Sequence, residues 1–182
     1  MSRTPRQWLS FACVLSLFGA AAATFCVGVA QEKAEKKEDP ALERARREVR
    51  LLDDVYKTSI VLVTTHYVQD ENGLAAGSAF RKLFEAMKEK GWHEARLLDA
   101  TGQPYNDENL PKEGFEKRAV KEILAGKPSY DEVITEDGKR YLLAATIVPV
   151  VMDKCIMCHE NYREVPKGKA IGAIGYKLEI QE

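Results

Sequence analysis

Apolar residues recur at spacings of three and four between residues 40 and 70, which is the pattern of one face of a long helix. Asp39 followed by Pro40 is a typical helix start, because Asp accepts hydrogen bonds from free amides and proline fits the first helical position. Residues 70–73 are a breaker cluster that ends it. The inward face would carry Val49, Leu52, Tyr56, Ser59, Val63 and His66.

The rest of the chain alternates between shorter helical and strand-like patterns. They predict helices at about 74–90 and 113–125, and strands at 92–98, 130–135, 140–148 and 170–180. Asp137-Gly138 between two of the strands is a strong two-residue hairpin signal. Glycines 172 and 175 mark places where something approaches the last strand closely. Residues 150–168 are expected to be irregular. A tight hairpin cannot join parallel strands, so the predicted fold class is α+β with an antiparallel sheet.

Composition narrows the class of protein. The 182 residues carry 27 Lys+Arg against 28 Asp+Glu, and 45% are hydrophobic, which excludes wholesale disorder. Without a basic excess, nucleic acid is not a favoured partner. Four cysteines are too few for a multi-disulfide scaffold. No catalytic signature stands out beyond the cysteine motif described below, so we do not expect an enzyme.

Residues 1–30 have the pattern of a secretory signal peptide. Two arginines precede an apolar run that closes on small residues before Gln31. We expect cleavage there, a periplasmic or otherwise extracytoplasmic location, and no membrane contact of the mature protein. The alternative is an uncleaved membrane anchor, since about 20 apolar residues can span a bilayer. Residues 31–39 would be a charged linker and residues 40–182 the folded domain.

The motif with the clearest chemistry is C-x-x-C-H at Cys155, Cys158 and His159. It is the attachment pattern of c-type haem. Two thiols at this spacing can each form a thioether with one haem vinyl group, and the following imidazole can bind the iron as the proximal ligand. We expect one covalently attached haem c per chain, and export agrees with this because haem c is attached outside the cytoplasm.

Three other uses of the cysteine pair compete with haem attachment. A structural disulfide is possible outside the cytoplasm, although such close pairs are usually redox-active. A thioredoxin-like redox pair belongs between a strand and a helix early in a βαβ unit, whereas this one comes late. A zinc site would need four ligands, and the chain offers only His66 and His93 besides the motif.

The sixth iron ligand is left open by the residues themselves. His66 is the first candidate, because it continues the inward helix face, and His93 is the second. The methionines are less favoured as ligands. Met87 is expected in the core, Met152 is too close to the motif to reach the iron, and Met157 is a spacer within the motif. A five-coordinate iron is also open.

The order of these parts resembles a family of exported, PAS-like c-type haem domains that is described as a domain of unknown function. The similarity covers about residues 45–182. Besides the long first helix, the matching stretches are residues 96–102, 115–116, 138–141, 149–150 leading into 155–159, and 172–175.

This resemblance implies a PAS-like twisted antiparallel sheet with flanking helices that enclose one haem. Members occur alone or as sensor modules, and in some the distal ligand comes from the N-terminal helical region and can be a cysteine. The mature chain has no spare cysteine, so the resemblance leaves His66 as the matching distal iron ligand.

The function expected from the sequence is that of an exported monohaem redox or small-ligand sensor. It would act through an unknown redox or signalling protein, since its output has to pass through another chain. The alternative is a periplasmic electron carrier, and less favoured is a CxxC thiol–disulfide oxidoreductase.

Overall fold

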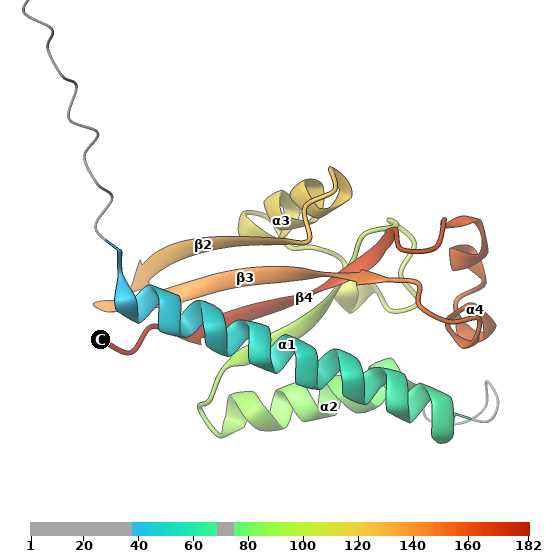
Figure 1. The fold of residues 1–182 in the computed structure, drawn as a ribbon, viewed down its shortest axis with the longest axis horizontal. Helices are drawn as coiled ribbons and strands as arrows, with labels where there is room; N and C mark the ends of the chain where they lie inside the picture. The colour runs from blue at the N-terminus through green and yellow to red at the C-terminus, as the bar shows by residue number, and fades with distance from the viewer. Residues whose placement is uncertain (1–37, 69–74) are drawn as a thin grey trace, which may run out of the picture. The chain divides into compact units, whose positions relative to one another are not determined.

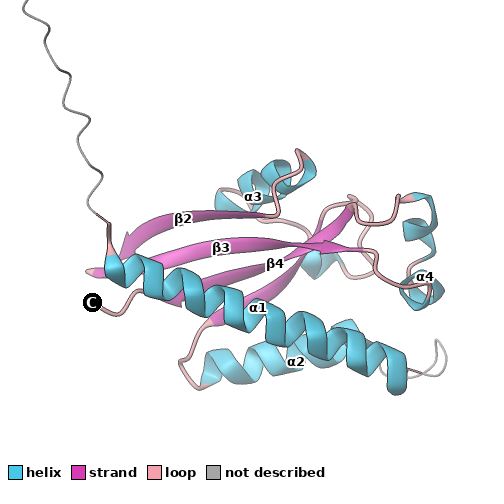
Figure 2. Ribbon diagram, in the orientation of Figure 1, coloured by secondary structure: helices cyan, strands magenta, loops and turns pink. Residues whose placement is uncertain are grey.

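A computed structural model describes residues 38–68 and 75–182 of the chain. The proposed signal peptide and the linker up to residue 37 lie outside the described residues. No helix among the described residues is long and apolar enough to cross a membrane. The described part is α+β and contains a four-stranded antiparallel sheet, which confirms the predicted fold class at that level (Figure 2).

The first helix, α1, spans Pro40–His66 and begins as the sequence predicts. The Leu42 amide donates to the Asp39 carboxylate at 3.0 Å, which satisfies one of the free amides of the first turn. The buried residues of α1 are Ala41, Ala45, Val49 and Tyr56. Burial along this helix is therefore concentrated in its N-terminal two thirds.

The remaining elements follow the predicted order, with short additions. Helices α2 and α3 span Ala76–Glu89 and Phe115–Leu124, and strands β1 to β4 span Glu94–Asp99, Ser129–Glu136, Lys139–Pro149 and Ala170–Glu179. The additions are a 3-10 turn η1 at Asp107–Asn109, helix α4 at Lys154–Cys158 and a 3-10 turn η2 at Glu160–Glu164. The expectation that residues 150–168 are irregular is thus wrong for α4 and η2, which are too short to show a periodicity.

The sheet has the order β1-β4-β3-β2. Strands β2 and β3 pair from Ser129↔Thr146 to Glu136↔Lys139, so Asp137 and Gly138 alone make the turn. Both have positive φ, 50° and 78°, as a type I′ hairpin requires. The last strand, β4, lies between β1 and β3 and so joins β1 to the β2–β3 hairpin in one sheet.

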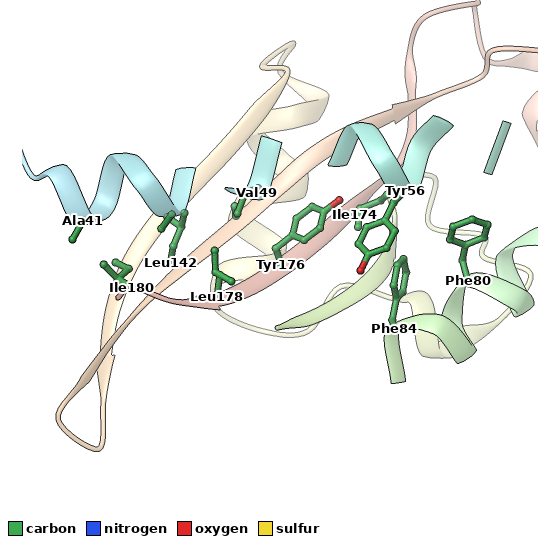
Figure 3. Close-up of a cluster of buried hydrophobic side chains, with 12 residues drawn as sticks. Ala41, Val49, Tyr56, Phe80, Phe84, Leu142, Ile174, Tyr176, Leu178 and Ile180 are labelled. Atoms are coloured by element: carbon green, nitrogen blue, oxygen red, sulfur yellow. The ribbon is translucent and has the colours of Figure 1, made fainter. Parts of the chain in front are cut away.

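Helices cover both faces of the sheet (Figure 1). One core cluster joins α1 and α2 to alternate residues of β3 and β4, among them Leu142, Ile174 and Tyr176 (Figure 3). The other joins α3 to residues of the opposite parity, such as Ala145 and Ala173. This alternation is the expected consequence of side chains pointing to opposite faces along a strand.

Two glycines of β4 lie against Leu98 of β1. A Cβ at Gly172 would lie 2.5 Å from the Leu98 carbonyl oxygen, and one at Gly175 would lie 3.2 Å from the Leu98 Cδ1 atom. The close approach predicted from the glycines is therefore made by the neighbouring strand itself.

Candidate functional site

The C-x-x-C-H motif lies in the connection between β3 and β4. Both cysteines belong to α4, and His159 follows as the residue that ends this helix, its amide donating to the Cys155 carbonyl at 3.2 Å. Cys155 is half-buried, and its thiol is free. The side chain of Cys158 is outside what the structure describes. One helical turn thus presents the cysteines and delivers His159 directly after them.

His159 is held between two tyrosines. Its imidazole stacks on the ring of Tyr162, with centroids 4.6 Å apart and an interplanar angle of 12°. The edge contact with Tyr105 has a centroid distance of 6.1 Å. Since η2 is a 3-10 turn, residues three apart lie on the same side, which brings Tyr162 under His159. Burial lowers the pKa of His159, and the charge of Asp99 opposes that shift.

A small apolar cluster packs in the β3–β4 connection beside the motif. Its buried members are Val150, Tyr162 and Ile171, and Val148, Cys155 and Val165 pack against them. Burial raises the pKa of Tyr162 to about 12, with smaller contributions from Asp99 and Cys155. A small apolar cluster is therefore packed beside the Cys155 thiol and the His159 imidazole.

A buried carboxylate, Asp99, organises the turn that follows β1. Asp99, at the end of β1, accepts hydrogen bonds from the Thr101 amide at 3.0 Å, the Thr101 hydroxyl at 2.8 Å and the Gly102 amide at 2.6 Å. This turn leads into the segment that carries Tyr105. Asn161 donates to the Gln103 carbonyl at 3.1 Å and ties that segment to η2. The loop after β1 and the loop after β3 thus form one unit around His159.

The C-terminal end of α1 contacts the segment before the motif. The Lys154 ammonium group donates to the Thr65 carbonyl at 2.9 Å, the Val68 carbonyl at 3.1 Å and the Thr64 carbonyl at 3.4 Å. The Thr65 hydroxyl also lies 4.0 Å from the Met152 sulfur. Both α1 and α4 reach the same end of the fold (Figure 1).

His66 is the last residue of α1 and is exposed. The expectation that its imidazole points into the domain interior is therefore wrong in this structure. The three-four spacing identifies the inward face correctly as far as Val63, which packs against the core. It does not reveal that the residues of α1 beyond Tyr56 are at most partly buried, because periodicity does not show where the core beneath a helix ends. The role of His66 toward iron stays a prediction.

His93, the second candidate, lies in a different part of the fold. It is buried, and its Nε2 atom is hydrogen-bonded to the Tyr56 hydroxyl at 2.8 Å. Burial lowers the pKa of His93, and Glu48 opposes the shift. Ten helical residues separate Tyr56 from His66, which is about 15 Å along the axis of α1. His93 is thus next to the middle of α1 and not next to its end.

Sequence reasoning missed several residues of this site and a second polar cluster. Tyr162 three residues after His159 and Lys154 directly before Cys155 were local signals that could have been used.

The second polar cluster is centred on Asp53, which accepts hydrogen bonds from the Tyr176 hydroxyl at 3.0 Å and from the Lys57 ammonium group at 2.8 Å. Burial, chiefly, raises the pKa of Tyr176. No local pattern predicts this cluster, because α1 and β4 are far apart in the sequence.

Comparison with known proteins returns one family model. It carries the description Tll0287-like and matches residues 30–179, which include the whole site from α1 to β4. No curated protein matches the chain. The match spans the folded domain and begins where the predicted leader ends.

Proposed function

The chain belongs to the Tll0287-like family, and we propose that it is an exported protein that holds one covalent c-type haem. In this proposal Cys155 and Cys158 form the two thioethers and His159 is the proximal iron ligand. The observation that carries it is the C-x-x-C-H motif presented by α4, with its imidazole already held against an apolar cluster.

The residues around the motif suit a haem. Cys155 is half-buried and packs against an apolar cluster, and apolar side chains are what a haem macrocycle packs against. Burial lowers the pKa of His159, so its imidazole stays neutral over a wider pH range, and the neutral form is the one that binds a metal. The antiparallel sheet with helices on both faces is consistent with a PAS-like domain, which we propose as the fold type.

Residues of the chain would set both the orientation of the iron-binding imidazole and the redox potential of the haem. Tyr162 sets the plane of the His159 ring by stacking. The buried Asp99 carboxylate supplies a negative charge near the same imidazole. A bound haem supplies a one-electron couple or a ligand-binding iron, and its surroundings tune the potential. A negative charge close to the iron favours the oxidised state.

We propose His66 as the distal ligand. Support comes from the contacts between the last turn of α1 and residues 152–154, which bring the turn that carries His66 to the segment that carries the cysteines. His93 is less suitable, because it is buried at the middle of α1 with Tyr56. Because His66 is exposed, coordination would require its side chain to turn toward a bound haem.

The physiological role we propose is that of a redox or small-ligand sensor that acts through a redox or signalling partner. One observation favours the electron-carrier alternative. Tyr105, which touches the edge of His159, is 85% exposed, so the proximal side of the site lies near the surface. A carrier needs such a short path from its haem to a partner.

Haem staining after denaturing electrophoresis tests the proposal. The full chain is expressed in a host with a cytochrome c maturation system, beside a Cys155→Ala/Cys158→Ala double variant and an Ile156→Ala control. We expect stain in wild type and control and none in the double variant. Wild type without stain, but with a reversible Cys155–Cys158 disulfide, would instead favour the thiol–disulfide alternative.

A further inference from the structure

Lys154 joins the segment before the cysteines to the end of α1. The last carbonyls of a helix have no intrahelical partner, and an ammonium group has three donors. Lys154 offers these donors to the carbonyls of Thr64, Thr65 and Val68, at 3.4, 2.9 and 3.1 Å. A positive charge is also favourable at this end of the helix dipole.

Up to Val68, where the described part of α1 and its C-terminal turn ends, the backbone amides after the helix donate to the carbonyl of Val63. The amides of Tyr67 and Val68 both donate to the Val63 carbonyl, at 2.9 and 3.2 Å. The contact between Thr65 and Met152 adds a second link between the same turn and the same segment. His66 lies between the carbonyls that Lys154 binds, so its backbone position is set by this contact.

We propose that Lys154 is a positioning residue, which fixes the last turn of α1 so that His66 can close the sixth coordination position of the iron. The inference rests on the proposed function. Lys154 precedes Cys155 in the chain, so a thioether at Cys155 and the ammonium cap would act from neighbouring residues. A haem held at Cys155 and the last turn of α1 would then be linked through two adjacent residues of α4.

The test compares holoproteins of wild type, Lys154→Met, Lys154→Arg and the control Lys167→Met, an exposed lysine of the same loop. The measurements are the low-spin fraction in the ferrous spectrum and the rate of carbon monoxide binding. Lys154→Met should retain covalent haem. Its rate of carbon monoxide binding should exceed that of the wild type by about tenfold, the effect expected for losing a charged hydrogen bond. Lys154→Arg should restore most of the wild-type rate, and Lys167→Met should match wild type.

A double variant separates positioning from a general effect on folding. In a His66→Ala background, Lys154→Met should not increase the rate of carbon monoxide binding further, because both changes act by removing His66 from the iron. A full additional increase would overturn the proposal. A Lys154→Met holoprotein with the spin state and carbon monoxide binding rate of the wild type would also overturn the proposal. The proposed haem attachment would be unaffected by that result.

Two other outcomes have defined meanings. If neither Lys154→Met nor a second variant, Lys154→Gln, yields holoprotein while the wild type does, Lys154 serves folding and the positioning role is wrong. If wild type itself carries no covalent haem, the proposed function fails, and the inference fails with it.

Discussion

The imidazole ring of His159 lies parallel to the phenol ring of Tyr162, with 4.6 Å between their centroids. This pair connects the cysteine motif to the apolar cluster of the β3–β4 connection. The orientation of the imidazole is thus set by a buried aromatic ring from the same loop.

Replacing that ring should affect both stability and the site. Tyr162→Ala should lower the free energy of unfolding by about 3–5 kcal/mol, the range for deleting a buried aromatic side chain. Tyr162→Phe retains the stacked ring and should cost much less. Denaturant unfolding measures both, and the visible spectrum of the holoproteins should change in Tyr162→Ala only. Equal losses in the two variants would contradict a role for the ring.

His66→Ala tests the distal ligand. If two imidazoles bind the iron, the wild-type ferrous spectrum is low-spin, and removing His66 should shift it toward high-spin and allow rapid carbon monoxide binding. His93→Gln is the control and should leave the spectrum unchanged, because His93 pairs with Tyr56 at the middle of α1. An unchanged low-spin spectrum in His66→Ala would move the assignment to His93 or a methionine. A high-spin wild type would show that no strong distal ligand exists.

The buried His93 should make the protein sensitive to acid. Burial lowers its pKa from the ordinary value of 6.5, so between the two pKa values the unfolded chain binds more protons than the folded protein. Stability therefore rises with pH across that window, and it is lost as pH falls below about 6.5. Urea unfolding of the holoprotein at several pH values should show this loss. His93→Gln should have a flatter profile, and an identical profile would contradict the assignment.

The strand contact at Gly172 predicts a strict requirement for glycine. Gly172→Ala would place a Cβ 2.5 Å from the Leu98 carbonyl oxygen, so one of two paired backbones must move. We expect a loss of about 1–3 kcal/mol in unfolding free energy, as for other overpacked sites. Gly175→Ala is the matched control and should cost less, because its nearest neighbour is the end of the Leu98 side chain, at 3.2 Å. A tolerated Gly172→Ala would contradict the geometry.

The helices and strands of this fold are predictable because they depend on interactions between residues close together in the sequence. The cap at Asp39 needs only the amide of Leu42, and the hairpin needs only the positive φ of Asp137 and Gly138. The cysteine motif is equally local. The sequence could therefore predict the helices, the strands and the residues that would attach a haem.

Long-range packing explains what could not be predicted. The exposure of His66 depends on where the core beneath α1 ends, which helical periodicity does not contain. The pairing of Tyr56 with His93 and the cap that Lys154 places on α1 join residues 37 and about 90 positions apart. The place of β4 between β1 and β3 is also a tertiary choice.

The proposed function depends on the covalent attachment of one haem at Cys155 and Cys158. The most direct measurement is the intact mass of the purified wild-type protein under denaturing, reducing conditions, after expression with a cytochrome c maturation system. We expect the mass of the polypeptide plus one haem, with the haem lost in the Cys155→Ala/Cys158→Ala variant. A wild-type mass equal to the polypeptide alone would contradict it.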